Sequence, residues 1–295
     1  MVQKLLQYDV LGRLGEGAKS TIYKVRDPGT GRILALKHVV RKDEKDIRFV
    51  EQMEAEFEVA KAFHHPHLRR CFEFKTNKTM IFKVTEAFLT MELVEGQPLD
   101  VSLPRDMIGI VEVFIQSAGA LHAMHKAGYV HCDIKPINIM ITTDGSVKVI
   151  DFGQSCKSGT VKERIQGTPD YIAPEQVARK PVTPQTDVFN LGATMYWAVT
   201  GRTIPTLYTV NKAGDNAILS DALFQTPQQL NPTIPDPFNR LIMECISTSP
   251  SKRPATMEMV IQRLELVKHI LMKKAGKLQE QGAASVAPDL YEDEP

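Results

Sequence analysis

Two short segments place chemically active side chains close together in the sequence. The first, residues 131–138, contains Asp133, Lys135 and Asn138, and the second is an Asp-Phe-Gly tripeptide that begins at Asp151. Asp151 and Asn138 carry the hard oxygen ligands that Mg²⁺ prefers. Asp133 can accept a hydrogen bond from an attacking hydroxyl, and Lys135 can neutralise charge on a transferring phosphate. Together these side chains suit phosphoryl transfer, which depends on positioning and charge more than on covalent help from the protein.

The composition is that of an ordinary globular protein. The chain has 295 residues, of which 43% are apolar and 24% charged, and its formal net charge is +1 without a dense basic cluster. We therefore expect no capture of nucleic acid or of an anionic membrane by charge. No apolar run approaches the roughly 20 residues needed to cross a bilayer. The first eight residues lack the apolar core of a secretory signal.

The four cysteines are scattered through the chain without a CxxC pair. They are Cys71, Cys132, Cys156 and Cys245. This spacing matches neither a zinc site nor a disulfide framework. A reducing, cytoplasmic setting is the expectation that follows.

The first forty residues predict three short strands, over residues 10–14, 22–25 and 34–39, with a turn at 27–31 between the last two. Gly15 and Gly17 lie between the first two strands, where a glycine backbone can approach phosphates closely enough for its N–H groups to donate to them. Taken alone, this pair also fits an ordinary hairpin, and Lys37 in the third strand also fits a solvated edge position.

A helix is predicted between residues 49 and 63, ending before Pro66. Four apolar side chains fall within one narrow arc of it: Phe49, Met53, Ala60 and Phe63. Glu56 lies in the same arc, whereas the other glutamates point to the opposite side: Glu51, Glu54 and Glu58. A carboxylate in an apolar stripe costs several kcal/mol unless it is paired. Glu56 therefore requires a cation, and Lys37 is the obvious candidate.

The run from Met80 to Met91 predicts two further strands, and residues 92–96 loosen into a connector. Helical patterning dominates after residue 104. One long helix is predicted over residues 108–125, with Gly128 as its stop, and a last helix over 260–271. Residues 273–295 turn polar and predict a disordered tail, with an acidic docking element as the alternative.

Taken in order along the chain, these motifs resemble the catalytic domain of eukaryotic-type serine/threonine protein kinases, over residues 8–272. The segment after Gly201 and the stretch 230–232 look closer to bacterial members. The resemblance implies an α+β, bilobal, protein-kinase-like fold: an antiparallel five-stranded N-lobe with one helix (about 8–93) and a mostly helical C-lobe (about 97–272). It also implies transfer of the γ-phosphoryl group of ATP, held with Mg²⁺ or alternatively Mn²⁺, to Ser or Thr hydroxyls of protein substrates.

By this resemblance, Asp133, Lys135 and Asn138 are catalytic, and Asn138 and Asp151 bind the metal. The nucleotide would contact residues of both lobes: Leu14, Gly15, Gly17, Ile22, Ala35, Lys37, Glu56, Met91, Glu92, Val94 and Met140.

Within that set, Lys37 would grip the α- and β-phosphates and Met91 would be the gatekeeper. The backbone of Glu92, and of Val94 or Leu93, would meet the adenine.

The resemblance also assigns structural roles. His131 would be a pin beneath the magnesium loop, and Asp187 would support the backbone of the catalytic loop. Residues 167–175 would end the activation segment, with Glu175 paired to Arg253.

Two positions depart from the family pattern. Ser20 stands where the family has a third glycine, and Cys132 stands where it has an arginine that pairs with a phosphate on the activation segment. The chain thus looks like a non-RD variant, in which activation-loop phosphorylation is not the expected switch. A pseudokinase is one alternative. A small-molecule phosphotransferase of similar fold is another, although such an enzyme would normally lack the stretch 167–175.

Overall fold

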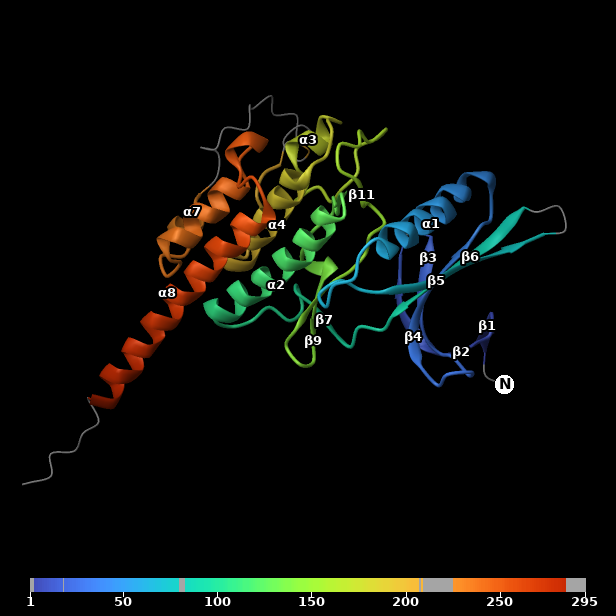
Figure 1. Ribbon diagram of the computed structural model, residues 1–295, viewed down its shortest axis with the longest axis horizontal. Coiled ribbons are helices and arrows are strands. Elements are labelled where there is room, and N and C mark those ends of the chain that lie inside the picture. The colour runs from blue at the N-terminus through green and yellow to red at the C-terminus, as the bar shows by residue number, and fades with distance from the viewer. Residues whose placement is uncertain (1–2, 18, 80–82, 207, 209–224, 285–295) are drawn as a thin grey trace, which may run out of the picture.

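The computed structural model describes residues 3–284 except 18, 80–82, 207 and 209–224. The described residues form two lobes, one built on an antiparallel sheet and one mostly helical, joined near residues 92–96 (Figure 1). This arrangement confirms the expected bilobal α+β architecture. The segment after Gly201 that looked closer to bacterial kinases falls largely outside the described residues.

The described residues of the N-terminal lobe form a six-stranded antiparallel sheet in the order β1-β2-β3-β4-β6-β5. Its strands are β1 (Lys4–Leu5), β2 (Tyr8–Glu16), β3 (Ser20–Arg26), β4 (Ile33–Val40), β5 (Cys71–Lys78) and β6 (Val84–Glu92). The three strands expected in the first forty residues are present as β2, β3 and β4, and β5 and β6 bring the number to the five expected for this lobe. The two-residue β1 adds a sixth strand at the edge, where it pairs with β2.

The expectation of two strands between Met80 and Met91 is wrong. Residues 80–82 lie outside the described part of the chain, and the rest of that run belongs to the single strand β6. Its partner β5 comes earlier in the sequence and lies at the edge of the sheet. Polar side chains on an edge strand can remain in water. Residues 75–78 of β5 are polar for this reason, so β5 lacks the hydrophobic alternation by which a strand is predicted from sequence.

Helix α1 (Ile47–Lys61) packs against β5 and β6 and follows a 3-10 turn, η1 (Glu44–Asp46). Its buried face contains Met53, Ala60 and, as predicted, Glu56, whereas Glu54 and Glu58 are exposed. Met53 contributes to the apolar core between the helix and the sheet. The helical phase read from the sequence is therefore confirmed.

The C-terminal lobe combines helices with short strands. Its helices are α2 (Met107–Lys126), α3 (Pro174–Val177), α4 (Pro184–Thr200), α6 (Pro227–Leu230), α7 (Asp236–Cys245) and α8 (Met257–Ala284), with 3-10 turns η2 (Pro136–Asn138) and η3 (Pro250–Lys252). Its strands are β7 (Gly96–Pro98), β8 (Tyr129–Val130), β9 (Ile139–Thr142), β10 (Val147–Val149) and β11 (Cys156–Lys157). The central helix α2 packs against α4 and α8.

Helix α2 is long and apolar enough, by length and composition, to cross a membrane, with a mean hydropathy of 1.4. Polar residues such as Glu112 and Gln116 interrupt the apolar sequence of the helix, so it is not one continuous apolar run. Its residues Val111, Phe114, Ala118 and Leu121 are fully buried in the core of the lobe. Within the described residues, α2 is thus a core helix whose apolar side chains contact other protein elements.

Helix α8 continues to Ala284, so the expectation of a disordered tail from residue 273 is wrong for residues 273–284; residues 285–295 lie outside the described part. In Figure 1 the end of this helix extends away from the other helices. Ten of the twelve residues from 273 to 284 are Lys, Ala, Gln, Glu or Leu, which are good helix formers, and the other two are glycines. Because the preceding turns are already helical, such residues can extend the helix without a packing partner.

The segment that follows α1 anchors the N-terminal lobe to β10. Arg69 donates its N–H to the carbonyl oxygen of Val149 over 3.1 Å, and Val149 donates in return to the carbonyl oxygen of His67 over 2.8 Å. The His67 ring contacts the carbonyl oxygen of Val147 at 2.9 Å. These bonds fix the end of α1 relative to the strand that leads into Asp151.

Candidate active site

Asp187 on α4, whose carboxylate is fully buried, supports the backbone of the catalytic loop. Asp187 accepts hydrogen bonds from the backbone N–H groups of His131 and Cys132, each over 2.8 Å, and contacts Nε2 of His125 at 2.8 Å. Cys132 has a φ of 67°, a conformation that costs energy for a residue with a side chain. The supporting role predicted for Asp187 is confirmed, since its bonds hold this strained turn in place.

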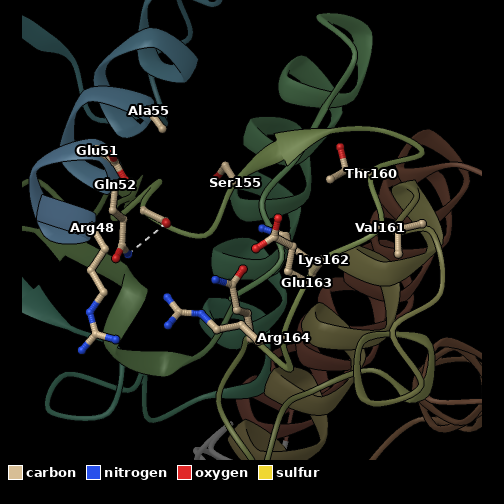
Figure 2. A pocket seen from close by; sticks show the side chains of 12 residues that line it. Arg48, Glu51, Gln52, Ala55, Ser155, Thr160, Val161, Lys162, Glu163 and Arg164 are labelled. Atoms are coloured by element: carbon tan, nitrogen blue, oxygen red, sulfur yellow. Dashed lines mark hydrogen bonds between the residues drawn. The ribbon is translucent and has the colours of Figure 1, made fainter. Parts of the chain in front are cut away.

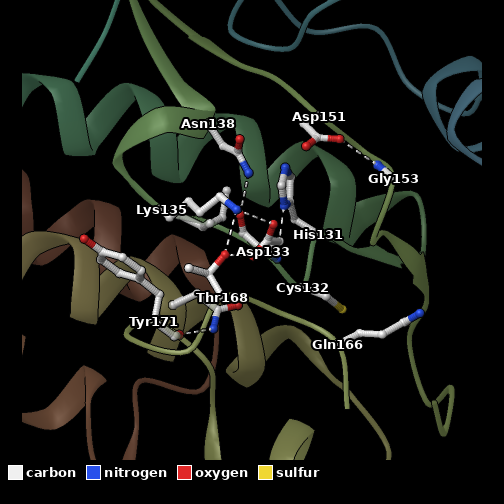
Figure 3. A network of polar contacts seen from close by, with 12 residues as sticks. His131, Cys132, Asp133, Lys135, Asn138, Asp151, Gly153, Gln166, Thr168 and Tyr171 are labelled. Carbon is white, nitrogen blue, oxygen red and sulfur yellow. Dashed lines mark hydrogen bonds and ion pairs between the residues drawn. The ribbon is translucent and has the colours of Figure 1, made fainter. Parts of the chain in front are cut away.

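Asp133, Lys135 and Thr168 form a closed triangle of polar contacts (Figure 3). Lys135 Nζ lies 2.9 Å from Asp133 Oδ2 and 2.6 Å from Thr168 Oγ1, and the Thr168 hydroxyl donates to Asp133 Oδ1 over 2.8 Å. Thr168 comes from the activation segment, so this triangle joins that segment to the catalytic loop. Asp133 is 8% exposed, so it is largely buried but keeps some contact with solvent.

Asn138 and Asp151, the predicted metal ligands, lie on neighbouring turns above this triangle (Figure 3). Asn138 Nδ2 donates to the carbonyl oxygen of Asp133 over 2.8 Å, which leaves Oδ1 as the atom that a cation would meet. The Asn138 carbonyl oxygen also accepts from the N–H of Ile150 over 2.9 Å, so both ligands belong to one hydrogen-bonded unit.

Asp151 is suited to bind a cation because its carboxylate stays charged. Burial alone would raise its pKa, but the positive charges of Lys37 and Arg69 outweigh this effect and hold the pKa below its usual value. The Gly153 N–H also donates to Asp151 Oδ1 over 3.2 Å. Asp151 and Asn138 therefore fit the oxygen-ligand chemistry of Mg²⁺ or Mn²⁺. Within the described residues, no group of three His, Cys, Asp or Glu side chains forms a further metal cluster.

The Asp-Phe-Gly turn is packed against α1 and the catalytic loop. Phe152 is 1% exposed, and its ring makes edge-on contacts with Phe63, at 5.4 Å between centroids, and with His131, at 5.8 Å. Gln52 on α1 donates from Nε2 to the carbonyl oxygen of Gly153 over 3.0 Å. These contacts couple the position of Asp151 to that of α1.

The predicted ion pair between Lys37 and Glu56 is present. Lys37 Nζ lies 2.6 Å from Glu56 Oε2, and Glu56 is completely buried. Burial tends to lower the pKa of Lys37, but the carboxylates of Glu56 and Asp151 raise it overall, so the ammonium remains protonated. Lys37 and Asp151 line the same cavity of about 200 Å³, together with Gly17.

A second cation, Arg69, shares the Glu56 carboxylate. Arg69 Nη2 lies 3.6 Å from Glu56 Oε1, and Arg69 is 9% exposed. Its Nε and the Oε1 atom of Glu56 lack hydrogen-bond partners among the described residues. Sequence reasoning missed Arg69. It forms a basic pair with Arg70 just before β5, and nothing in the sequence shows that the Arg69 side chain is the buried one. The sequence did indicate that the buried carboxylate of Glu56 requires a cation. That requirement allows a second cation beside Lys37.

A cleft of about 420 Å³ lies between the lobes. The predicted nucleotide residues that line it are Leu14, Gly15, Ile22, Ala35, Glu92, Val94 and Met140, and Leu93, Arg69, Ile137 and Ile150 line it as well. Met91 is fully buried in β6 directly opposite Ala35 of β4, so it packs behind the cleft wall. The Glu92 N–H donates to the carbonyl oxygen of Arg70 over 2.8 Å. An apolar cleft next to a charged cavity suits a base on one side and phosphates on the other.

The protein kinase domain family model matches residues 8–264. The chain belongs to the protein kinase domain family. It is 30% identical over 285 residues to a probable serine/threonine-protein kinase of Clostridium perfringens, covering 91% of this chain and 39% of that protein. It is 30% identical over 257 residues to the serine/threonine-protein kinase PknA of Mycobacterium tuberculosis, covering 84% of this chain and 58% of that protein. The chain thus spans about two fifths to three fifths of the length of these relatives.

The activation segment of this kinase domain ends on a buried ion pair. Arg253 donates to both carboxylate oxygens of Glu175, over 2.7 and 3.0 Å, as predicted. Gln176, which sequence reasoning missed, donates from Nε2 to the carbonyl oxygen of Cys132 over 2.8 Å and also to that of Gln166 over 3.1 Å. The end of the segment is therefore attached directly to the catalytic loop of the kinase domain.

A cavity of about 530 Å³ lies between α1 and the activation segment. Figure 2 shows the side chains that line it. Its lining includes the basic residues Arg48, Lys162 and Arg164 and the acidic residues Glu51 and Glu163. Glu51 thus faces this cavity and not Lys37, in agreement with the helical phase of α1.

Proposed function

We propose that this chain is a serine/threonine protein kinase that transfers the γ-phosphoryl group of ATP to Ser or Thr hydroxyls of protein substrates. The observation that carries the proposal is the Asp133–Lys135–Thr168 triangle, which lies below the two metal-type ligands Asn138 and Asp151. The names of the bacterial relatives add support for this acceptor class.

Each side chain of the site has a task that its contacts fit. The Asp133 carboxylate accepts the hydrogen bond of the acceptor hydroxyl and orients its oxygen toward the phosphate. Lys135, held between Asp133 and Thr168, neutralises charge on the transferred group. Lys37, held by Glu56, contacts the inner phosphates. A divalent cation bound by Asn138 and Asp151 would supply further positive charge between the phosphates.

A protein acceptor is favoured over a small molecule by the activation segment. Thr168 belongs both to the triangle and to the stretch 167–175, so this stretch lies beside the Asp133 carboxylate. The stretch is anchored at its far end by Glu175 and Arg253. An extended acceptor segment could therefore lie along a fixed part of the chain while its hydroxyl reaches Asp133.

The departure at Cys132 leads to a further part of the proposal, that this kinase is a non-RD variant. Cys132 is 1% exposed, and a neutral thiol offers no charge to an activation-segment phosphate. Lys162 and Arg164 belong to that segment and share a cavity with Arg48, and the two carboxylates of the cavity, Glu51 and Glu163, offset part of this basic charge. The cytoplasmic location that we expect from the cysteine spacing also remains part of the proposal.

The test is phosphoryl transfer by the purified chain. We would incubate it with γ-labelled ATP, Mg²⁺ and a basic acceptor protein, using Asp151→Ala as the matched inactive control. Acid hydrolysis of the product should release phosphoserine and phosphothreonine. Phosphotyrosine as the main product would refute the acceptor class. Nucleotide binding without any transfer would refute the enzyme assignment and favour a pseudokinase.

A further inference from the structure

Two cysteines that are far apart in the sequence lie in contact beside the catalytic loop. The Sγ atoms of Cys132 and Cys156 are 3.9 Å apart. Strand β11 brings them together, because it pairs with β8 so that Cys156 lies opposite Val130, two residues before Cys132. Both sulfur atoms belong to a small apolar cluster with Val130 and Val182. Cysteine spacing alone gave no sign of this contact.

We propose that Cys132 and Cys156 form a reversible disulfide that ties the catalytic loop to the activation segment. The bond would join the same two segments that, by family resemblance, an arginine and a phosphate join in related kinases. In this chain Cys132 cannot bind a phosphate of the activation segment, but its oxidation with Cys156 would link the catalytic loop to that segment. The bond itself does not depend on the proposed kinase function, whereas its consequence for catalysis rests on that function.

The local electrostatics favour the thiolate of Cys156 as the attacking group. The hydrogen bond from Cys132 lowers the pKa of Cys156 to about 6 in spite of partial burial, and the Lys162 ammonium adds to this effect. The same contact, together with burial, raises the pKa of Cys132. Burial raises the pKa of the other two thiols, Cys71 and Cys245, to about 12. Reaction should therefore begin at Cys156.

A peroxide supplies the oxidising equivalents. The Cys156 thiolate attacks one peroxide oxygen, so that an S–O bond forms, the O–O bond breaks and hydroxide leaves. Cys132 then attacks the Cys156 sulfur, forming the S–S bond and releasing the hydroxyl group and the Cys132 proton as water. In sum, two thiols lose two electrons and two protons, and hydrogen peroxide becomes two molecules of water. A thiol reductant reverses the reaction by exchange.

The backbone shows which segment would move. A disulfide requires the sulfur atoms to approach to about 2.05 Å. The backbone of Cys132 is fixed on both sides, since its N–H donates to Asp187 and its carbonyl oxygen accepts from Gln176. Cys156 lies on a strand of two residues. We therefore expect Cys156 to shift toward Cys132, leaving Asp133 and its neighbours in place.

The first experiment maps the bond. The purified chain is treated with a small excess of hydrogen peroxide and digested without reduction. We expect a linked peptide pair containing Cys132 and Cys156, lighter by two hydrogen atoms than the separate peptides and split by dithiothreitol. Cys71→Ala should give the same pair and Cys156→Ser should not. The proposal is overturned if the wild-type protein forms no such pair, or if Cys71→Ala abolishes it.

A second variant follows the intermediate. In Cys132→Ser the resolving thiol is missing while the hydroxyl can still donate a hydrogen bond to Cys156, so peroxide should leave a sulfenic acid on Cys156 that dimedone traps. Circular dichroism would establish that the variant is folded. Trapping at Cys71 or Cys245, with none at Cys156, would contradict Cys156 as the first thiol to react.

The consequence is measured on the activation segment. Disulfide formation should slow tryptic cleavage after Lys162 and Arg164 by about fivefold or more, because it restricts local opening. Phosphoryl transfer by the oxidised wild-type protein should stay within about threefold of the reduced rate, since the contacts of Asp133 do not include Cys156. A tenfold loss that dithiothreitol reverses would refute the expected direction of movement. Because the peptide map needs no activity, it decides the disulfide even if the chain transfers no phosphoryl group.

Discussion

Replacing Glu56 by glutamine tests the charge cluster behind the nucleotide site. Glu56 is fully buried, with Lys37 2.6 Å from one carboxylate oxygen and Arg69 3.6 Å from the other. Glutamine has nearly the same shape but no charge, so Glu56→Gln leaves two buried cations with Asp151 as their nearest remaining counter-charge. The variant should lose both stability and activity.

The size of the loss follows from the two interactions removed. Taking one partner from a buried ion pair costs about 3–5 kcal/mol. The glutamine oxygen can still accept a hydrogen bond from Lys37, and such a bond to a charged group retains about 1.5 kcal/mol. The net loss is about 1.5–3.5 kcal/mol. A loss of this size in transition-state stabilisation corresponds to a fall of roughly 10- to 400-fold in kcat/KM. The N-terminal lobe should also melt at a lower temperature.

The pH dependence gives a second readout with a defined sign. In the wild-type protein the carboxylates of Glu56 and Asp151 raise the pKa of Lys37 against the effect of burial. Their stabilising effect is therefore complete below the ordinary lysine pKa and is lost only as the pH rises through the higher folded value. In Glu56→Gln burial remains while the main carboxylate is gone, so Lys37 should deprotonate at a lower pH. Activity of this variant should then fall earlier on the alkaline side than wild-type activity.

Steady-state kinetics from neutral to alkaline pH and thermal unfolding by circular dichroism would measure these effects. The matched control is Glu54→Gln, which removes the same charge from an exposed position on the same helix. The control should behave like the wild-type protein in both measurements. If Glu54→Gln lost as much activity as Glu56→Gln, or if Glu56→Gln lost less than about threefold, the role assigned to the cluster would be wrong.

Three further predictions concern the reaction and its control. Asp133→Asn should bind ATP with little change but lose most phosphoryl transfer, and near wild-type turnover would contradict the role of this carboxylate. Asp151→Ala should lose the dependence of ATP affinity on Mg²⁺, so titrations with and without EDTA should give the same affinity, unlike the wild-type protein. Replacing Ser155, Ser158 and Thr160 together by alanine should change the rate by less than about threefold, whereas a hundredfold loss would mean that a basic residue of the neighbouring cavity binds an essential phosphate.

Sequence reasoning was most successful where the relevant residues are close in the chain. Asp133, Lys135 and Asn138 occupy one loop, so their proximity needs little knowledge of the fold. The position of Glu56 was predictable for a different reason. A helix has a fixed angular step, and one carboxylate in an apolar arc shows which face is buried.

Features that depend on contacts between distant segments were harder to predict. Strand β5 carries a polar surface because it lies at an edge, a fact known only once the sheet order is known. The contact between Cys132 and Cys156 arises from the pairing of two strands of two residues each, too short to show any periodicity. The extension of α8 beyond residue 272 was not predicted. A polar composition shows that a segment does not pack into a core, but it does not show that the segment is not helical.

Arg69 shows how such a distant contact changes the physical account of the site. With Lys37 as its sole partner, the buried carboxylate of Glu56 would keep α1 in place only as long as that lysine engaged it. Arg69 is attached through its backbone to Val149, in the strand that leads to Asp151. The ion pair with Arg69 therefore links Glu56 to the C-terminal lobe as well as to the sheet. The position of α1 is in this way coupled directly to the turn that holds the metal ligand, even when Lys37 is occupied by phosphate.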